Sequence, residues 1–342
     1  MPNSGTYKSV IITRKGGPEV LQVISNDLRP PVKNEVRIKV ICTGVGFTDV
    51  IMRYGYYPFA PKIPFAPGYE IVGIVDAVGD GVSTVKTGDR VAALTVHGGY
   101  AEYIYLAPEH LVAVPGSLDA AEALCLILNY VTAYQMLHRE ASIKQGQKIF
   151  ITGAAGGVGT ALLQLGKVAG VETFGTASKS KHDFVKSQGG VPIDYQTGDI
   201  VSAVKSHTGD MGVDAAFDAL GGSYLWKCYQ TLRAGGTLVS FGLTASVKNA
   251  KSDNLIAFGS FGLIGLLTML PDGKKVKFYG ITALYRKNPQ PFKEDLSKLF
   301  HLLAEKKLQP VIAEKFSMLD AAKANALLEQ GKVSGKIILM ND

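Results

Sequence analysis

The sequence is poor in cysteine, and the spacing of the few it has limits what the protein can be. Only three cysteines occur in 342 residues, namely Cys42, Cys125 and Cys228, and no two of them form a C-x-x-C pair. This spacing excludes a disulfide framework and a clustered cysteine zinc site. It also favours a reducing compartment, so we expect a cytoplasmic protein.

The chain also lacks the charge pattern of a nucleic-acid-binding protein. Its formal net charge is +7, but lysines and arginines occur singly or in pairs, without a run of five like charges. We therefore expect no nucleic-acid partner. Residues 1–17 contain no apolar h-region, so no secretory signal is expected.

One apolar run, residues 254–270, approaches the length of a membrane span. It is interrupted by glycines and is shorter than the roughly 20 residues that a span needs. The alternatives are a membrane span, a mobile apolar wall of a substrate pocket, and a contact with a partner. We expect one of the last two and no membrane span.

Residues 1–122 predict a compact domain built mainly of strands. A single short helix is expected over residues 47–55, with Asp49 near its start, where a carboxylate suits the helix dipole. The final strand, residues 336–340, is expected to return to this domain, so that residues 306–342 complete it. The expected strands are rich in β-branched residues and are bounded by Gly, Pro, Asp or Asn. They cover residues 9–14, 35–44, 70–79, 90–94 and 101–106.

Residues 123–305 predict a second domain in which strands and helices alternate. A helix pair over residues 119–137 leads into it, and the first strand is expected at residues 148–153. This order is typical of a parallel sheet that is covered by helices on both faces. The predicted fold class is therefore α/β, a doubly wound sheet joined to a β domain.

A glycine-rich turn follows the strand at residues 148–153 and opens a helix. On the G-x-G-x-x-G pattern, Ala154 takes the first place, and Gly156 and Gly159 take the others. The second glycine lets the backbone approach a pyrophosphate, the third allows close helix packing, and the helix N-terminus offers free N–H groups. A dinucleotide site is therefore expected, and a purely structural turn is the alternative. The predicted contacts are Ala155, Gly156, Gly157 and Val158.

The end of the next strand favours NADPH over NADH. Sites for NAD place an Asp or Glu about 20 residues past the glycines, where it binds the ribose 2′-hydroxyl. Residues 175–182 read GTASKSKH instead, so hydroxyl and ammonium groups replace the carboxylate. These groups make charge-assisted hydrogen bonds to a 2′-phosphate. We predict NADPH; an exposed basic loop is the alternative.

Several short motifs are collinear along nearly the whole chain. They are the G-x-x-F-x-D run that begins at Gly44, PGYEIVGIVDAVGDGV, TGDRV, GGYAEY, NYVTAY, AAGGVG, the DAL-GG loop from Asp218 and the terminal SGKIIL. Together they resemble the quinone oxidoreductase (zeta-crystallin-like) branch of the medium-chain dehydrogenases/reductases, with some VAT-1-like features. The resemblance implies a GroES-like catalytic domain, a Rossmann coenzyme domain and a homodimer. The dimer would join coenzyme sheets edge to edge, with residues 275–281 at that edge.

The resemblance also allows the sequence to be checked for the ligands of a catalytic zinc ion. Related alcohol dehydrogenases carry a cysteine ligand in T-G-x-C-x-x-D and a histidine ligand in G-H-E. Gly46 and Tyr69 stand at those places here and leave Glu70 alone. A catalytic zinc site needs three protein ligands. We therefore expect no metal.

The resemblance further assigns cofactor contacts residue by residue. Ser178 and Lys181 bind the 2′-phosphate and Tyr195 lies beside the adenosine. Thr132 lies by the nicotinamide ribose. The backbone around Phe241, Gly242 and Leu243 holds the carboxamide end of the nicotinamide. The predicted set is completed by Gly46, Leu220 and Lys336.

Tyr57 is the predicted catalytic residue. It matches a tyrosine that is assigned to the acceptor oxygen in enoyl reductase relatives, and a phenol can donate a hydrogen bond or proton to a developing enolate. The alternative is an aromatic wall that only stacks on a quinone ring. Many relatives have asparagine where this chain has Gly46, and that side chain contacts the nicotinamide or the substrate. Because Gly46 lacks it, the sequence leaves undecided whether the protein reduces quinones.

Two functions are compatible with these features. The first is an NADPH-dependent reductase of quinones or α,β-unsaturated carbonyls. The second is a VAT-1-like NADPH-binding protein with weak or no turnover, which acts through a partner or membrane contact of residues 254–270. The retained cofactor features favour the enzyme.

Overall fold

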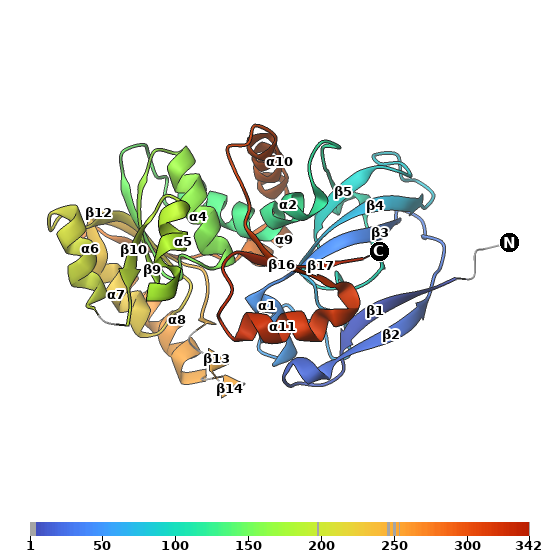
Figure 1. The fold of residues 1–342 in the computed structure, drawn as a ribbon, viewed down its shortest axis with the longest axis horizontal. Coiled ribbons are helices and arrows are strands. Elements are labelled where there is room, and N and C mark those ends of the chain that lie inside the picture. Colours follow the sequence, from blue (N-terminus) through green and yellow to red (C-terminus); the bar gives the residue numbers. More distant parts are fainter. Residues whose placement is uncertain (1–4, 197, 245–246, 249–250, 253, 342) are drawn as a thin grey trace. The chain divides into compact units, whose positions relative to one another are not determined.

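The computed structural model describes residues 5–341, apart from positions 197, 245, 246, 249, 250 and 253. Its contacts divide the chain into two compact units (Figure 1). The first unit comprises Met1–Val131 and Tyr285–Asp342, and the second comprises Thr132–Leu284. Each unit is described by itself below.

These boundaries differ from the predicted ones at residues 122 and 305. Residues 123–131 and 285–305 belong to the first unit, not to the coenzyme domain. The reason is the packing of helix α10 (Gln290–Ala304), which contacts η3 (Leu126–Tyr130) and strand β7 (Val112–Ala113). An amphipathic helix buries its apolar face against a core, but its own sequence does not show which domain that core belongs to.

The first unit is built on a seven-stranded sheet in the order β16-β17-β3-β4-β5-β7, with β6 paired to β3. Strand β17 pairs antiparallel with β3, which confirms that the C-terminal strand returns to this domain. The strand bounds are Val36–Val45 (β3), Glu70–Val78 (β4), Arg90–Leu94 (β5), Tyr103–Leu106 (β6), Val112–Ala113 (β7), Ile312–Ser317 (β16) and Lys336–Met340 (β17).

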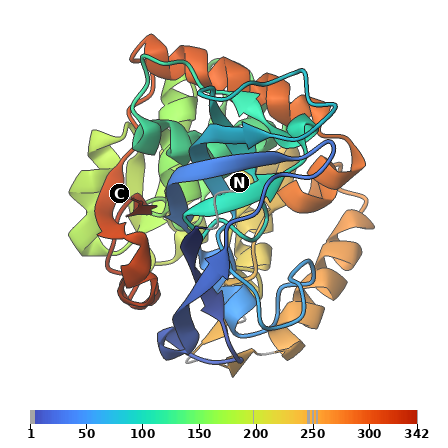
Figure 2. The same cartoon turned by 90° about the vertical axis from the view of Figure 1, so that its right-hand side faces the viewer.

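Strands β1 (Thr6–Ile12) and β2 (Leu21–Asp27) form a separate antiparallel ribbon, drawn in dark blue in Figure 2. The sequence predicted β1 but not β2 or β16. Most residues of β2 are at least partly exposed, so the apolar alternation that marks a half-buried strand is weak there. Short helices η1 (Pro18–Val20) and η2 (Pro108–His110) connect strands of this unit.

The core of the first unit lies on one face of its large sheet. Alternate residues of β3, Val36, Ile38 and Val40, pack there with Ile71 and Val75 of β4. Successive side chains of a strand point to opposite faces, so this alternation sets the register of the sheet.

Helices α1 (Phe47–Arg53) and α11 (Ala321–Glu329) of the first unit are joined by a buried arginine. The guanidinium of Arg53 is fully buried and lies 2.5 Å from Oε1 of Glu329. It also donates to the carbonyl oxygen of Gly16. The helix predicted over residues 47–55 is therefore present and is anchored to the C-terminal part of the chain. A 3-10 turn, η7 (Met318–Asp320), precedes α11.

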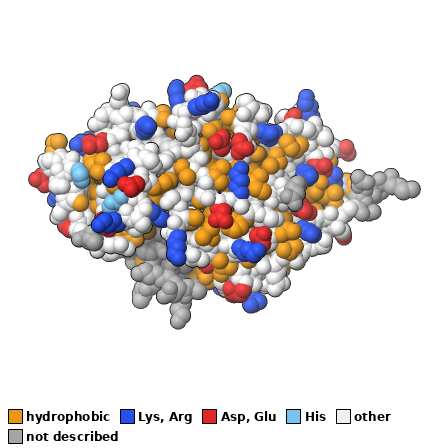
Figure 3. Space-filling model, in the orientation of Figure 1, with side chains coloured by type: hydrophobic (Ala, Val, Ile, Leu, Met, Phe, Trp, Pro, Cys, Tyr) orange, Lys and Arg blue, Asp and Glu red, His pale blue; other side chains and the backbone are white. Residues whose placement is uncertain are grey.

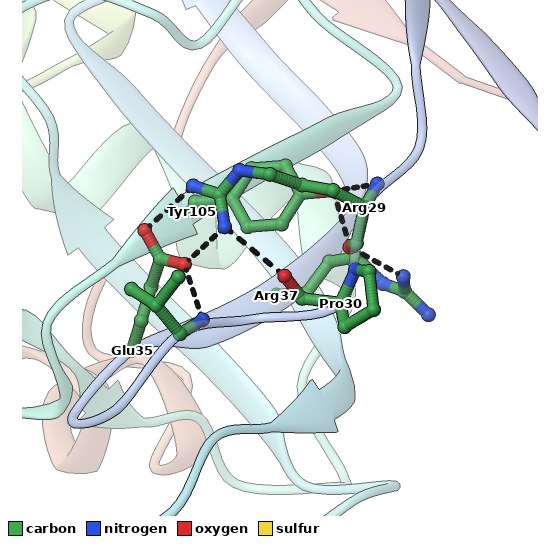
Figure 4. A network of polar contacts seen from close by, with 6 residues as sticks. Arg29, Pro30, Glu35, Arg37 and Tyr105 are labelled. Carbon is green, nitrogen blue, oxygen red and sulfur yellow. Dashed lines mark hydrogen bonds and ion pairs between the residues drawn. The ribbon is translucent and has the colours of Figure 1, made fainter. Parts of the chain in front are cut away.

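A surface network of the same unit ties β3 and β6 to the preceding loop (Figure 4). Arg29 binds Glu35 with both terminal nitrogens, at 2.6 and 2.9 Å, and stacks over the ring of Tyr105 at 4.0 Å. The hydroxyl of Tyr105 donates to the carbonyl of Arg29 and accepts from its amide. Arg37 donates to the same carbonyl.

The expected helix pair is a single helical stretch, Ala120–Glu140, made of α2 (Ala120–Cys125), η3, α3 (Val131–Tyr134) and η4 (Gln135–Glu140). Asp119 caps its start by accepting from the amides of Ala121 and Glu122. Among the described residues it is the one helix long and apolar enough to span a membrane, and 78% of that window is buried. Core helices of globular proteins commonly have this composition.

The second unit contains a six-stranded parallel sheet in the order β10-β9-β8-β11-β12-β15. The first strand, β8, lies in the middle, and the chain builds outward from it in both directions. This is the doubly wound arrangement that the sequence predicted. The strand bounds are Lys148–Ile151 (β8), Glu172–Ala177 (β9), Val191–Asp194 (β10), Val213–Asp218 (β11), Leu232–Ser240 (β12) and Lys275–Phe278 (β15).

Helices cover both faces of this sheet (Figure 1). Side chains of α6, α7 and α8 pack on one face in a core that includes Phe150, Phe174, Leu225 and Leu267. Helices α4 and α5 lie on the other side. The helix bounds are Gly157–Val168 (α4), Lys179–Lys181 (η5), His182–Ser187 (α5), Ile200–Thr208 (α6), Ser223–Thr231 (α7), Asn254–Thr268 (α8) and Ile281–Lys287 (α9). A short hairpin, β13 (Val247–Lys248) and β14 (Lys251–Ser252), precedes α8.

Strand β15 is at one edge of the sheet, where the resemblance placed the edge strand of residues 275–281. Among the strands that the structure describes, it pairs with β12 alone. An edge strand presents unpaired backbone groups that can pair with another chain.

On the face drawn in Figure 3, basic and acidic side chains are interspersed.

Candidate active site

The predicted cofactor residues of the second unit, except Thr132, follow the carboxyl ends of five parallel strands. In doubly wound sheets, ligands bind outside these ends, at the point where strand order reverses. That point lies here between β8 and β11. The residues are Ala155–Val158 after β8, Ser178 and Lys181 after β9, Tyr195 after β10, Leu220 after β11, and Phe241–Leu243 after β12.

The turn after β8 has the geometry of a phosphate-binding turn. Gly153 adopts a φ of 69°, and Gly156 is the N-cap residue of α4. A Cβ on Gly159 would overlap the carbonyl oxygen of Gly153 and the backbone of Ala154, so only glycine fits there. The tight turn is therefore made by Gly153, one residue before the position that the fingerprint alignment gave to Ala154. The helix N-terminus faces the edge where a pyrophosphate would bind.

Asp218 and Thr152 shape the neighbouring loop, and the sequence assigned neither of them a role. The hydroxyl of Thr152 donates to Oδ1 of Asp218 at 3.0 Å and accepts from the amide of Ala219. The two carboxylate oxygens of Asp218 accept from the amides of Leu220 and Gly221, at 3.1 and 2.8 Å. Burial raises the pKa of Asp218, and these hydrogen bonds oppose the rise. The clamp fixes the loop that carries Leu220.

The loop after β9 presents two hydroxyls and lysines in one turn. The hydroxyls of Ser178 and Ser180 lie 3.2 Å apart, and the amide of Lys181 donates to the carbonyl of Ser178. Partial burial lowers the pKa of Lys181, while Lys179 is exposed. Such a turn can bind a phosphate through charge-assisted hydrogen bonds.

The remaining predicted residues of the second unit differ in exposure. Thr132 is buried in α3, and Tyr195 is 42% exposed. The amide of Phe241 donates to the carbonyl of Asp218 at 2.9 Å, which holds the end of β12 against β11. A Cβ on Gly242 would overlap the carbonyl of Ala219, so this segment packs backbone to backbone.

Gly46, Tyr57 and Lys336 belong to the first unit. Tyr57 lies in the loop after α1, and its hydroxyl oxygen is 2.5 Å from that of Tyr69. The two rings meet edge to face, and the ring of Phe59 also meets Tyr57 edge to face at 5.7 Å. The guanidinium of Arg286 lies over Phe59. Tyr57 is therefore part of an aromatic cluster with one cation beside it.

Gly46 is the N-cap residue of α1, and its amide donates to Oδ2 of Asp49 at 2.8 Å. The other oxygen of Asp49 accepts from the amide of Gly68. Burial raises the pKa of Asp49 to about 6. A Cβ on Gly46 would meet nothing closer than 3.6 Å, so glycine is not required there by packing.

Lys336 and Glu70 form a buried ion pair, with Nζ of Lys336 at 2.5 Å from Oε1 of Glu70. A Cβ on Gly44 would overlap both side chains, so the pair depends on glycine at that position. The places of the zinc ligands are taken by Gly46 and by Tyr69, whose hydroxyl meets Tyr57, and Glu70 faces a lysine. This donor set does not fit a catalytic zinc ion.

The apolar run at residues 254–270 forms α8 and the turn after it. One side of the helix packs on the core through Leu267 and Ser260, while the other side presents an apolar stripe to solvent. The exposed members of the stripe are Phe258, Phe261, Leu266, Met269 and Leu270. Exposed apolar side chains gathered on one side of a helix are typical of a contact surface.

Comparison with known proteins identifies the family. A profile described as "Alcohol dehydrogenase GroES-like domain" matches residues 32–116, and one described as "Zinc-binding dehydrogenase" matches residues 190–339. The synaptic vesicle membrane protein VAT-1 homolog of Danio rerio is 32% identical over 346 residues, which cover 98% of this chain and 70% of that protein. The chain spans between 62% and 70% of the length of four VAT-1 homologues that it matches.

Quinone oxidoreductases are similar over their full length. That of Homo sapiens is 28% identical over 338 residues, with 97% of each chain covered. The crystal structure of Escherichia coli quinone oxidoreductase complexed with NADPH superposes with a TM-score of 0.86 at 27% identity, covering 98% of this chain and 100% of that one. The chain therefore belongs to the medium-chain dehydrogenase/reductase superfamily, among the homologues of VAT-1 and quinone oxidoreductase.

Proposed function

We propose that the protein is a zinc-independent, NADPH-dependent reductase of quinones or α,β-unsaturated carbonyls. The observation that carries this proposal is the gathering of the predicted cofactor residues at the carboxyl edge of the six-stranded sheet. NADPH, when bound, supplies the hydride. Related proteins, such as the Escherichia coli quinone oxidoreductase, have been crystallised in complex with NADPH.

The chain's own residues would hold the cofactor in three places. The free N–H groups at the start of α4 suit the pyrophosphate, and Gly156 leaves room for it. Ser178 and Lys181 suit the 2′-phosphate, for which a carboxylate would be repulsive. Backbone groups of Phe241–Leu243 suit the carboxamide end.

The acceptor oxygen needs a hydrogen-bond donor because the zinc ligands are replaced. Tyr57 is the proposed donor, since a phenol can stabilise or protonate a developing enolate oxygen. The aromatic rings of Tyr57 and Phe59 would favour a flat apolar acceptor. Gly46 leaves space where many relatives carry asparagine.

A turnover assay tests this proposal. Purified protein is incubated with NADPH and a panel of quinones and enones, and the loss of absorbance at the nicotinamide band is followed. We expect oxidation of NADPH with at least one acceptor and a clear reduction of that rate in Tyr57→Phe. An absence of oxidation across the whole panel, in protein that binds NADPH, would refute the enzymatic proposal.

The exposed stripe of α8 favours a second candidate function. In this alternative the protein binds NADPH with weak or no turnover and acts through an apolar contact of α8. It predicts that Phe258→Ser with Leu266→Ser abolishes sedimentation with anionic phospholipid vesicles or with a partner, while NADPH binding is kept. Met211→Ser is a matched control, since Met211 is 70% exposed elsewhere in the second unit. Unchanged sedimentation of the double variant would rule this alternative out.

The edge position of β15 supports the proposal of a homodimer that pairs this strand across a two-fold axis. Val276 is buried and Phe278 is 47% exposed, so Phe278→Pro would disturb the free edge more than the core. We expect the wild-type protein to sediment as a dimer and this variant as a monomer. A monomeric wild-type protein would contradict the proposal.

A further inference from the structure

The side chain of Arg286 lies against the aromatic cluster that contains Tyr57. The central carbon of its guanidinium is 4.9 Å from the centre of the Phe59 ring, and that ring meets Tyr57 edge to face at 5.7 Å. All three residues belong to the first unit. A cation and the proposed hydrogen-bond donor therefore neighbour the same ring.

Arg286 differs from other arginines of the chain in having no carboxylate beside it. Within the part of the chain that the structure describes, its side chain forms no ion pair and no hydrogen bond, and it is exposed. A guanidinium presents a rigid fork of donors that matches a carboxylate. Its donors are thus available to an anion from solution. Four other arginines are each paired with a carboxylate, namely Arg29, Arg37, Arg53 and Arg233.

The segments that form this cluster contain no acidic residue. Asp and Glu are absent from residues 50–69, which carry Tyr57 and Phe59, and from residues 273–293, which carry Arg286. They are also absent from residues 90–101. The charge of Arg286 is therefore not neutralised by its neighbours in sequence or by those of the ring on which it lies.

One acid acts near this end of α9, on the residue before Arg286. Burial, and after it the charge of Glu109, raises the pKa of Tyr285 to about 12. Tyr285 is buried and its hydroxyl lies 2.9 Å from Nδ1 of His110. Glu109 forms no ion pair with Arg286 among the described residues, so it leaves the guanidinium available.

The charge of Arg286 also reaches His97. The imidazole of His97 meets the ring of Phe65 edge to face at 6.2 Å. Burial lowers the pKa of His97, and the charge of Arg286 lowers it further. An imidazole has an ordinary pKa of about 6.5, so His97 is neutral at neutral pH. The permanent charge at this place is thus that of Arg286.

The loop that carries His97 has an unusual backbone. The preceding residue, Val96, adopts a φ of 66° although it is β-branched and buried. A β-branched residue in the left-handed region is a genuine outlier, and such strain is concentrated at active sites and ligand clamps. This observation is independent of the charge of Arg286 and favours a binding role for the same cluster.

We propose that the acceptor of this protein is a conjugated carbonyl compound that carries a carboxylate. Arg286 binds the carboxylate, while the flat conjugated part lies against the rings of Tyr57 and Phe59. This inference rests on the proposed reductase function and narrows its substrate class. The carboxylate is a recognition group and takes no part in bond making.

The contact with Phe59 prepares Arg286 for this role. A guanidinium that already lies over an aromatic ring loses less conformational freedom when an anion binds. Hydrogen bonds between two charged groups are stronger than those between neutral groups. Because the side chain is exposed, solvent and salt weaken the attraction, so we expect a moderate selectivity.

The test compares para-carboxybenzylideneacetone with its methyl ester, which has the same conjugated system without the charge. The ratio of kcat/KM for the two compounds is measured with NADPH in wild type, Arg286→Gln and Lys287→Gln. Lys287 is the matched control because it is an exposed cation at the same end of α9. We expect wild type and Lys287→Gln to prefer the carboxylate by about 5- to 30-fold, and Arg286→Gln to lose this preference.

Three results would overturn the proposal. They are a wild type that does not prefer the carboxylate, a preference that persists in Arg286→Gln, and an equal loss in Lys287→Gln. The last result would show that general positive charge attracts the acid, without a specific contact to Arg286.

A binding measurement separates this proposal from the reductase function on which it rests. Both compounds are titrated into the protein with NADP⁺, which has no hydride to give, and binding is followed by ligand-observed NMR. If neither compound is reduced but Arg286 is needed for tighter binding of the carboxylate, the reductase proposal fails and recognition of the carboxylate stands. If both are reduced without selectivity, the reductase stands and this inference fails. If neither is bound or reduced, both fail.

Discussion

The ammonium nitrogen of Lys336 lies 2.5 Å from Oε1 of Glu70, and both side chains are buried. Neither carboxylate oxygen of Glu70 has a hydrogen bond of good geometry among the described residues, so the lysine is what offsets its charge. Lys336 comes from the terminal strand β17 and Glu70 from the start of β4. The pair therefore fastens the end of the chain into the sheet of the first unit.

Breaking this pair from one side should be costly. We expect Lys336→Met to lower the free energy of unfolding by about 3–5 kcal/mol, because an uncompensated buried carboxylate remains. Combining it with Glu70→Gln should recover much of the loss. Urea denaturation of the two single variants and the double variant measures this. Equal losses in Lys336→Met and in the double variant would contradict the pairing.

The buried carboxyl of Asp49 should make stability depend on pH. Burial, aided by the charge of Glu70, raises its pKa to about 6 in the folded protein, while the amides of Gly46 and Gly68 oppose this rise. The folded state therefore binds a proton more readily than the unfolded state, whose pKa is about 3.9. This contribution to stability is present at low pH and is lost as the pH rises to about 6.

The measurement is a comparison of wild type with Asp49→Asn by urea denaturation at pH 4.5 and pH 7. The variant cannot titrate, so the difference between the two proteins isolates Asp49. We expect the wild type to lose about 2 kcal/mol relative to the variant over this range. A difference that does not change with pH would refute the assignment.

Glycine at position 159 should be indispensable, unlike glycine at position 262. A Cβ on Gly159 would overlap the backbone of Gly153 and Ala154, so Gly159→Ala should destabilise the protein by about 1–3 kcal/mol. Gly262 lies in α8 with open space around it, and Gly262→Ala should stabilise by about 0.5–1 kcal/mol. Thermal unfolding of both variants distinguishes them. Similar small effects would mean that the turn is not closely packed.

The sequence predicted the second unit well because its strands and helices alternate. Once a parallel sheet is expected, the loops after β8, β9, β10, β11 and β12 must gather at one edge, whatever their own sequences. Residues such as Ser178 and Phe241 could therefore be grouped before any contact was known. Their roles towards a cofactor remain predictions.

Contacts between distant segments could not be predicted in the same way. The clamp of Asp218 on Thr152 needs the register of β8 and β11, and an aspartate at a strand end has many other uses. The pairing of Tyr57 with Tyr69 depends on the path of an irregular loop. The G-x-Y turn and the replaced histidine position were visible in the sequence, but their proximity was not.

Cofactor preference should depend on Lys181. We expect Lys181→Ala to weaken NADPH binding by about 10- to 150-fold, corresponding to about 1.5–3 kcal/mol for a hydrogen bond to a charged group. Binding of NADH should change little, since it lacks the 2′-phosphate. Nicotinamide fluorescence titrations of wild type and variant with both cofactors measure this.

Lys179→Ala is the matched control, because Lys179 is exposed in the same 3-10 turn, whereas Lys181 is partly buried. A selective loss of NADPH binding in Lys181→Ala alone would establish a specific phosphate contact. Equal losses in both variants would instead point to general positive charge in the loop, whose effect falls as salt is raised. If the wild type shows no preference for NADPH over NADH, the assignment of NADPH as the cofactor loses its basis. The alternative of a binding protein with weak or no turnover is then favoured.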